Sequence, residues 1–199
     1  MRHFVAHSIA AAGCFFAAFS SAVTNAAPHK ILDLRNLSDA SGEYSISLCA
    51  RPSPGPAGLP GHAFVTYSFK PANGERKIAS IGFTTAAGTL KGVLSFSALL
   101  ATPTGYLGEE KYSSINENCL IALVNESEFN QAMSQAKPFA NLPGLDSLTY
   151  LGVYSLTSND CITFISSVAK TLETRGLKVP ARAVTDTPPV YLRKLIEAN

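Results

Sequence analysis

The chain has little charge for its length, and the charge it has is not gathered in one place. Its 199 residues include 16 lysines and arginines against 14 aspartates and glutamates, which gives a formal net charge of +2. The basic residues are scattered, with no stripe and no block of like charge. A nucleic-acid-binding protein generally gathers positive charge on one face. The sequence therefore gives no support for nucleic acid as a partner.

Long apolar runs are lacking beyond the first residues of the chain. There, Arg2 precedes a long apolar stretch that ends in small residues around Ala26, a pattern typical of a secretory signal peptide. We expect residues 1–26 to be this signal peptide, and residues 27–199 to form one domain that is exported, either periplasmic or secreted. Cys14, which follows Ala-Ala-Gly, leaves lipoprotein processing open as an alternative. No later stretch approaches the ~20 apolar residues that cross a bilayer, so no transmembrane segment is expected.

Cysteines are few and, after cleavage, odd in number. Loss of Cys14 with the signal peptide leaves Cys49, Cys119 and Cys161. Exported proteins fold where thiols oxidise, so three cysteines allow one disulfide and leave one thiol. Cys49 ends one strand-like segment and Cys119 opens another, and two strand ends can approach within disulfide distance. We predict a Cys49–Cys119 disulfide and a free thiol at Cys161; the alternative is that another pair forms, or none.

Alternation of apolar and polar residues, together with β-branched and aromatic side chains, predicts several strands. They cover residues 43–49, 62–69, 77–85 and 119–125, and Asn73-Gly74 between the second and third is a strong hairpin signal. Residues 27–42 are interpreted as a polar lead-in. Residues 86–115 are ambiguous, with 93–100 fitting either a strand or a short helix. Strands outnumber helices and most neighbours look antiparallel, so the predicted fold class is α+β.

Spacing of three and four residues between apolar positions predicts two longer helices and a short terminal one. The first covers residues 126–137, with Asn125 as its N-cap and Glu128 at the reciprocal position of a capping box. The second starts near Asn159 and ends before Gly176, a fitting residue for a helix C-terminus.

The second helix carries a cysteine in its first turn. Its apolar stripe consists of Cys161, Phe164, Ile165, Val168, Ala169 and Leu172. Cys161 therefore faces the core, and because cysteine is among the most buried residue types, simple packing is one interpretation. The other is catalysis, because unpaired N–H groups and the helix dipole at a helix start favour an anion, and the thiolate is the nucleophilic form.

A nucleophilic cysteine needs a base, and histidine is scarce in this chain. Of four histidines, His3 and His7 leave with the signal peptide, and His29 lies in the new N-terminal segment. Only His62 falls in a predicted ordered element, at the head of a strand. His62 is either a surface residue at a loop–strand junction or the base for Cys161.

The segment NDCITFISSVAKTLETRGLKVPAR, residues 159–182, resembles the nucleophile helix of NlpC-type cell-wall peptidases. That family has Asp-Cys-Ser-Gly-Phe-Val at the start of an amphipathic helix, followed by Gly, Pro and Arg. The matching residues are Asp160, Cys161, Phe164, Ile165, Gly176, Pro180 and Arg182. Ile162-Thr163 departs from Ser-Gly, and the histidine, in PGHAFVTY, precedes the cysteine. This order resembles the circularly permuted branch of the papain-like fold, which includes lecithin:retinol acyltransferase-like proteins.

The resemblance implies a papain-like domain in which the cysteine helix packs on an antiparallel sheet that carries the histidine. It implies Cys161 as the nucleophile, His62 as the base, and a third polar residue on a neighbouring strand that orients the imidazole. A two-residue turn at Asn73-Gly74 would place Thr85 opposite His62, and a one-residue bulge would place Thr84 there. Thr85 is the candidate orienting residue, or else a plain strand residue. The backbone N–H of Cys161 is a candidate oxyanion donor.

The function expected from these residues is that of an exported cysteine hydrolase that cleaves an amide bond, favoured in a peptide of the cell wall such as peptidoglycan. No metal or organic cofactor is implied. One alternative keeps the fold but acts on a lipid ester or a thioester, or transfers an acyl group, with the apolar residues 93–101 lining an acyl site. Another is a disulfide-braced module that binds a partner and has little or no catalytic activity.

Overall fold

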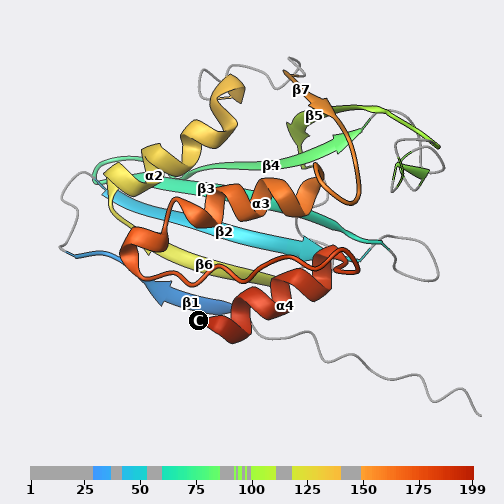
Figure 1. The fold of residues 1–199 in the computed structure, drawn as a ribbon. Coiled ribbons are helices and arrows are strands. Elements are labelled where there is room, and N and C mark those ends of the chain that lie inside the picture. Colours follow the sequence, from blue (N-terminus) through green and yellow to red (C-terminus); the bar gives the residue numbers. More distant parts are fainter. Residues whose placement is uncertain are drawn as a thin grey trace, which may run out of the picture.

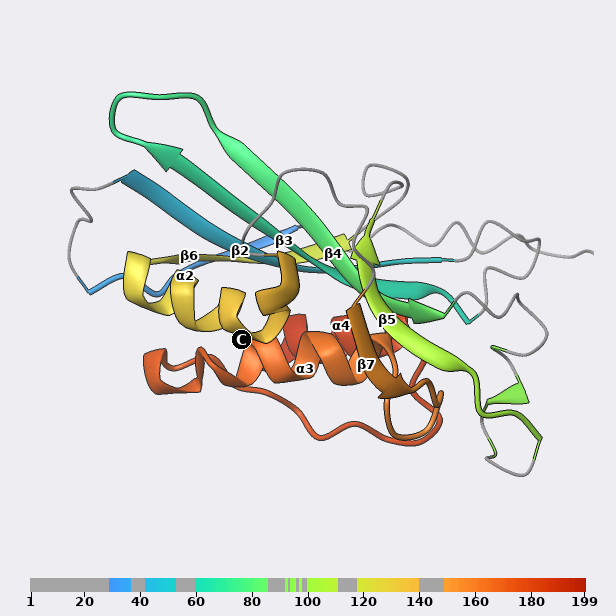
Figure 2. The same ribbon diagram turned by 90° about the horizontal axis from the view of Figure 1, so that it is seen from above.

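The computed structural model describes residues 29–36, 42–52, 60–85, 92, 94, 95, 97, 100–110, 118–139 and 149–199. Within these residues the chain is α+β, with helices on one face of a mixed, seven-stranded sheet (Figures 1 and 2). The predicted signal peptide, its cleavage site and Cys14 lie outside the described residues, as do most of residues 86–99.

The sheet has the strand order β1-β6-β2-β3-β4-β5-β7. Its strands are β1 (Lys30–Asp33), β2 (Gly42–Arg51), β3 (His62–Pro71), β4 (Lys77–Thr85), β5 (Thr104–Glu109), β6 (Asn118–Val124) and β7 (Thr149–Val153). All pairings are antiparallel except that of β1 with β6, which is parallel. The predicted strands are confirmed, but the interpretation of residues 27–42 as a polar lead-in is wrong because the segment contributes β1.

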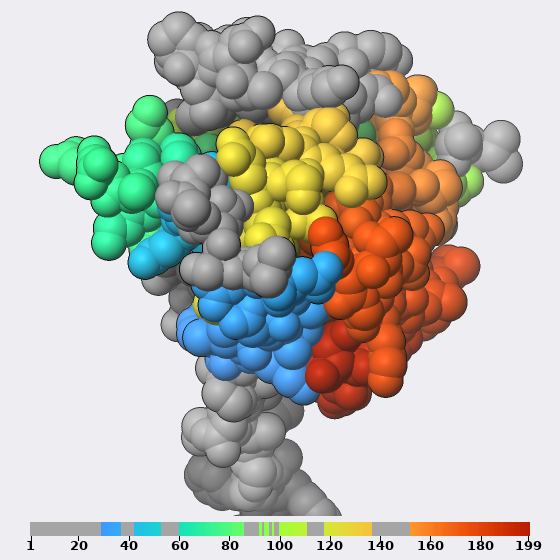
Figure 3. Space-filling view, turned by 90° about the vertical axis from the view of Figure 1, so that its left-hand side faces the viewer, coloured from blue at the N-terminus to red at the C-terminus, as the bar shows by residue number. Residues whose placement is uncertain are grey.

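Three α-helices cover one face of this sheet in the described part of the chain (Figure 2). They are α2 (Glu126–Met133), α3 (Cys161–Lys170) and α4 (Pro188–Ala198), with short 3₁₀ turns η1 (Ser134–Phe139) and η2 (Glu173–Arg175). Helix α3 packs on β3 and β4, and α4 packs on β2 and β6. Figure 3 shows β1, in blue, against the red C-terminal part, where Lys30 Nζ donates to the carbonyl of Ile196 at 3.4 Å.

The main core lies between the sheet and the helices, and strand alternation explains its membership. On β2 the residues Tyr44, Ile46 and Leu48 are buried in it, whereas the serines between them are only partly buried and belong to the other face. Helix α3 and Leu172 just after it contribute the whole predicted stripe, including Cys161. The resulting arrangement places the first turn of α3 beneath the strands that carry His62 and its neighbours.

Helix α3 starts where its sequence predicts, but it ends at Lys170, and the helical structure before Gly176 is completed by the 3₁₀ turn η2. Asp160 is the N-cap residue, and its Oδ1 accepts from the backbone N–H groups of Ile162 and Thr163, both at 3.1 Å. After η2, Gly176 adopts the left-handed conformation at φ +93°, which glycine tolerates without strain. The prediction for Gly176 is therefore confirmed.

Helix α2 also begins after Asn125, but the predicted capping box does not form. The side chain of Asn125 makes no capping hydrogen bond to α2; its Oδ1 accepts instead from Asn36 N–H at 3.3 Å. Glu128 is buried and accepts from Arg175 Nε at 2.7 Å. The guanidinium of Arg175, in η2, thus binds the Glu128 carboxylate that the capping box would have used.

Truncating the apolar stripe of α3 tests the packing of this helix. Leu172→Ala is expected to lower the free energy of unfolding by about 3 kcal/mol, as buried large-to-small changes do, because Leu172 is fully buried. Val184→Ala is the matched control, since Val184 is 73% exposed. Urea unfolding of both variants decides the point, and equal midpoints would contradict the packing.

Candidate active site

The disulfide predicted from cysteine parity is present. Cys49 and Cys119 lie directly opposite each other on β2 and β6, with their Cα atoms 4.2 Å apart and their sulfurs bonded. Phe64 packs against both cysteines in a small cluster separate from the main core. Cys161 is the free cysteine of the described residues and is buried. The pairing prediction is therefore confirmed, and Cys161 keeps its thiol.

His62 is the first residue of β3 and pairs across the sheet with Arg51, the last residue of β2. Gly61 precedes it at φ +86°, and a Cβ there would lie 2.8 Å from the carbonyl oxygen of Arg51. A side chain at position 61 would thus be strained and would clash with backbone. The ring of His62 stacks on that of Phe64, with centroids 6.4 Å apart. Gly61 and Phe64 together fix where the imidazole lies.

The register between β3 and β4 differs from the predicted one. The last pair is Phe64 with Gly82. If this register continued by two more residues, His62 would lie opposite Thr84 and not opposite Thr85. The reason is the turn: β3 ends at Pro71 and β4 begins at Lys77, so Asn73-Gly74 lies inside a longer connection. The register that led to Thr85 as orienting residue is therefore wrong by one position. Thr85 pairs with Gly105 of β5.

Glu110 is the residue that contacts the imidazole. It follows β5 directly, and its Oε2 lies 3.1 Å from Nε2 of His62. Its other oxygen, Oε1, accepts from Arg51 Nη2 at 3.0 Å. Both Glu110 and Arg51 are largely buried, with side chains 6% and 13% exposed. The carboxylate therefore holds one nitrogen of the ring and is itself held by a guanidinium.

Gly82 makes room for this contact. A Cβ at Gly82 would lie 2.5 Å from Nε2 of His62, closer than any real packing distance. The imidazole thus lies against the backbone of β4 where it contacts Glu110. A side chain of any size at this position would displace the ring.

The ionisation of His62 is set by its two polar neighbours. Burial lowers the pKa of the imidazole, but the hydrogen bonds and charges of Cys161 and Glu110 raise it more, to about 9. Nε2 of the ring faces Glu110, and a hydrogen bond between His62 and the Cys161 side chain contributes to the raised pKa of the imidazole. A cysteine, a histidine and a carboxylate, drawn from α3, β3 and the end of β5, therefore form one chain of contacts.

Cys161 lies at the first position of α3, where backbone donors are available. The N–H groups of Ile162 and Thr163 are taken by Asp160, and that of Phe164 by the Asp160 carbonyl. Among the described residues, the N–H of Cys161 has no hydrogen-bond partner. It is the donor of this helix start that remains open for an oxyanion.

Tyr154 is a further polar neighbour of the thiol. It follows β7, is 8% exposed, and its ring centroid lies 5.6 Å from that of Phe83. Burial raises the pKa of its phenol, and the charge of Cys161, the charge of Asp160 and a hydrogen bond with Cys161 raise it further. The phenol is therefore protonated at neutral pH and able to donate toward the sulfur.

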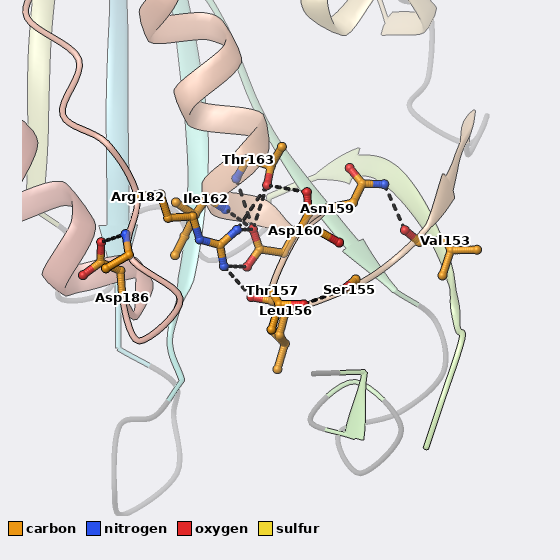
Figure 4. A network of polar contacts seen from close by, with 12 residues as sticks. Val153, Ser155, Leu156, Thr157, Asn159, Asp160, Ile162, Thr163, Arg182 and Asp186 are labelled. Atoms are coloured by element: carbon orange, nitrogen blue, oxygen red, sulfur yellow. Dashed lines mark hydrogen bonds and ion pairs between the residues drawn. The ribbon is translucent and has the colours of Figure 1, made fainter. Parts of the chain in front are cut away.

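The start of α3 is tied to two other segments by Arg182 (Figure 4). Its Nη1 and Nη2 donate to Oδ1 and Oδ2 of Asp160, both at 2.7 Å. Nη2 also donates to the carbonyl of Leu156 in the turn before the helix. Burial raises the pKa of Asp160, and the charge of Arg182 opposes this rise. Asp160, the residue just before Cys161, is thus held in a bidentate ion pair.

A cavity of about 240 Å³ opens beside the imidazole. It is lined by Arg51, His62, Gly82, Thr84, Gly108, Glu109 and Glu110. Cys161 is not among these residues, and it is only 2% exposed. In this conformation the accessible part of the site is the imidazole and the carboxylate, and not the thiol.

The sequence patterns single out Cys161 and His62 but do not indicate Glu110, Arg51 or Tyr154. The signal for Glu110 was weak. It consists of two acidic residues at the end of the strand-like TGYLGEE, and these lie within residues 86–115, for which the sequence pattern was ambiguous. Arg51 and Tyr154 gave no local signal, because their roles depend on the pairing of β2 with β3 and on the turn before α3. Within the described residues there is no group of three or more histidine, cysteine, aspartate or glutamate side chains that could hold a metal ion.

Comparison with known proteins identifies no relative. No family model, no curated protein and no solved structure matches the chain. Among the residues that the structure describes, none of the helices is long and apolar enough to cross a membrane.

Proposed function

We propose that this chain is an exported cysteine hydrolase that cleaves an amide bond, with Cys161 as the nucleophile and His62 as the base. Glu110 takes the orienting role for which Thr85 was the first candidate. The observation that carries the proposal is the single imidazole placed between the Glu110 carboxylate, at 3.1 Å, and the thiol at the start of α3. The substrate we propose is a peptide of the cell wall.

In the proposed reaction Cys161, His62 and Glu110 each have a defined role in every step. The Cys161 thiolate attacks the scissile carbonyl, and the N–H of Cys161 donates to the oxyanion. His62, as imidazolium, gives its proton to the leaving amine, which leaves a thioester on the sulfur. His62, now neutral, takes a proton from water, which attacks the thioester and releases the acid. Glu110 holds the ring throughout, as the third member of such triads does.

The proposed fold is a circularly permuted papain-like domain. Its support is the order of elements: a strand that begins with the histidine comes early, and the cysteine helix comes late and packs on that sheet. The α+β class and the mixed sheet agree with this proposal but are shared by many folds.

One observation favours a second candidate, a disulfide-braced module that binds a partner without catalysis. Cys161 is buried and does not line the cavity at His62. A structural cysteine packed under a helix has the same appearance. The distinction is chemical, because only a nucleophile reacts quickly at neutral pH.

The deciding experiment is alkylation of the folded protein with iodoacetamide at pH 6.5, followed by a peptide map. We expect an adduct on Cys161 within minutes, while Cys49 and Cys119 remain joined. Acyl release is then compared across cell-wall peptides, lipid esters and thioesters. An unmodified Cys161 would remove the catalytic proposal, and activity confined to lipid esters or thioesters would overturn the amide substrate.

A further inference from the structure

Asp160, which caps the helix that carries Cys161, places a negative charge close to the proposed thiolate. Asp160 satisfies the N–H groups of Ile162 and Thr163, which a serine, threonine or asparagine could do without a charge. As a carboxylate, it puts a negative charge one residue before the sulfur. A like charge at this range disfavours the thiolate that the proposed reaction needs.

The structure supplies a countercharge at the same place. The guanidinium of Arg182 meets both oxygens of Asp160 at 2.7 Å, and the two side chains are only 16% and 2% exposed. Bidentate pairs of this kind are among the strongest charge-assisted contacts, and burial protects them from screening by salt. The pair as a whole is neutral, so the dipole and the free N–H at the start of α3 act on the sulfur unopposed.

Arg182 also fixes the geometry around the sulfur. It comes from the extended segment after Gly176 and donates to the carbonyl of Leu156, in the turn that leads from β7 into α3. Nη1 further donates to Thr163 Oγ1 at 3.2 Å. One side chain therefore joins the turn before the nucleophile, the first turn of its helix and a segment far along the chain (Figure 4).

We propose that Arg182 is a positioning residue for Cys161, which cancels the charge of Asp160 and so preserves the thiolate. The inference rests on the proposed function, since it concerns the reactivity of the same thiol. Among the residues that the structure describes, the other titratable groups around the sulfur are His62 from β3 and Tyr154 after β7, with Glu110 behind His62.

Opposite shifts in the pH dependence of alkylation would identify a charge effect. Arg182→Met leaves Asp160 uncompensated, so the pH midpoint of Cys161 alkylation rises by about one unit, and the rate falls about tenfold at a pH well below both midpoints. Asp160→Asn keeps an N-cap and leaves the guanidinium uncompensated, so the midpoint falls. The double variant returns to within about threefold of the wild-type rate at pH 7, because it restores neutrality.

Two controls separate charge from structure. Arg182→Lys keeps the charge without the bidentate contact, so its midpoint stays near that of wild type although its melting temperature falls. Arg175→Met breaks another ion pair with a buried carboxylate, that of Arg175 in η2 with Glu128 in α2, beyond the end of α3 opposite to Cys161. It is expected to lose stability with an unchanged alkylation profile. Circular dichroism checks that each variant is folded before alkylation is measured.

The outcomes distinguish this inference from the proposed function. If wild-type Cys161 fails to react at pH 6 to 7, the proposed function is removed. If it reacts but both single variants move the midpoint in the same direction, or neither moves it, the role of Arg182 is structural and the inference is overturned. Should Arg182→Met not fold, Asp160→Asn must still lower the midpoint and the double variant must raise it again. Any other result contradicts the inference.

Discussion

Cys161→Ala is expected to abolish the hydrolysis of the activated ester p-nitrophenyl acetate, with a fall of about a thousandfold or more in the rate. In the proposed mechanism the Cys161 sulfur forms the acyl intermediate, and no other described cysteine carries a free thiol. The burst of nitrophenol that marks formation of an acyl-enzyme should vanish in the variant. Stopped-flow absorbance on wild type and variant measures both effects.

The matched control removes one atom from the same helix. Ser167→Ala takes away a hydroxyl that donates to the carbonyl of Phe164 at 2.7 Å, on the side of α3 away from the sheet. Its activity should equal that of wild type. Cys161→Ala itself keeps the Cβ in the core, so we expect it to fold with a melting temperature close to that of wild type. A Cys161→Ala protein that retains the burst would assign the ester hydrolysis to another group.

Local patterns in the sequence were sufficient for most elements and for the helix that carries Cys161. Alternation on β2 and the stripe on α3 arise within a few residues, so they can be recognised without knowing the partners. The Cys49–Cys119 pairing followed from parity and from the positions of the two cysteines at strand ends. β1 escaped notice because a strand of four residues, Lys30–Asp33, shows too little alternation to stand out, and its place in the sheet depends on β6.

Features that depend on distant segments could not be predicted. The capping box at Asn125 failed because Arg175, which is remote in sequence, binds Glu128. The orienting residue was sought at Thr85 because the turn was taken to be as short as its Asn-Gly signal allows. The longer connection shifts the register, and the ring instead reaches across Gly82 to a residue after β5. Cys161 and His62, the proposed nucleophile and base, could be named from local patterns, whereas the carboxylate that contacts the imidazole depends on the arrangement of the whole sheet.

Glu110→Gln is expected to lower kcat/KM for the same ester by about a thousandfold, as loss of the charge that orients a catalytic imidazole does. The amide keeps the size of the side chain, but it can present its NH₂ group to Nε2 and cannot stabilise an imidazolium. Glu109→Gln is the matched control. Glu109 is the adjacent residue, lines the same cavity and is exposed, and it should retain full activity.

The pH dependence gives the same variant a second test. The pKa of His62, about 9 in the folded protein, lies above its reference value of 6.5. The stability that its charged form contributes is therefore fully present below about pH 6.5 and is lost as the pH rises through about 9. Glu110→Gln removes one cause of this raised pKa, so the difference in unfolding free energy between wild type and variant should be larger at pH 6.5 than at pH 9.5. Urea unfolding at the two pH values measures it. A difference independent of pH would mean that Glu110 does not stabilise an imidazolium.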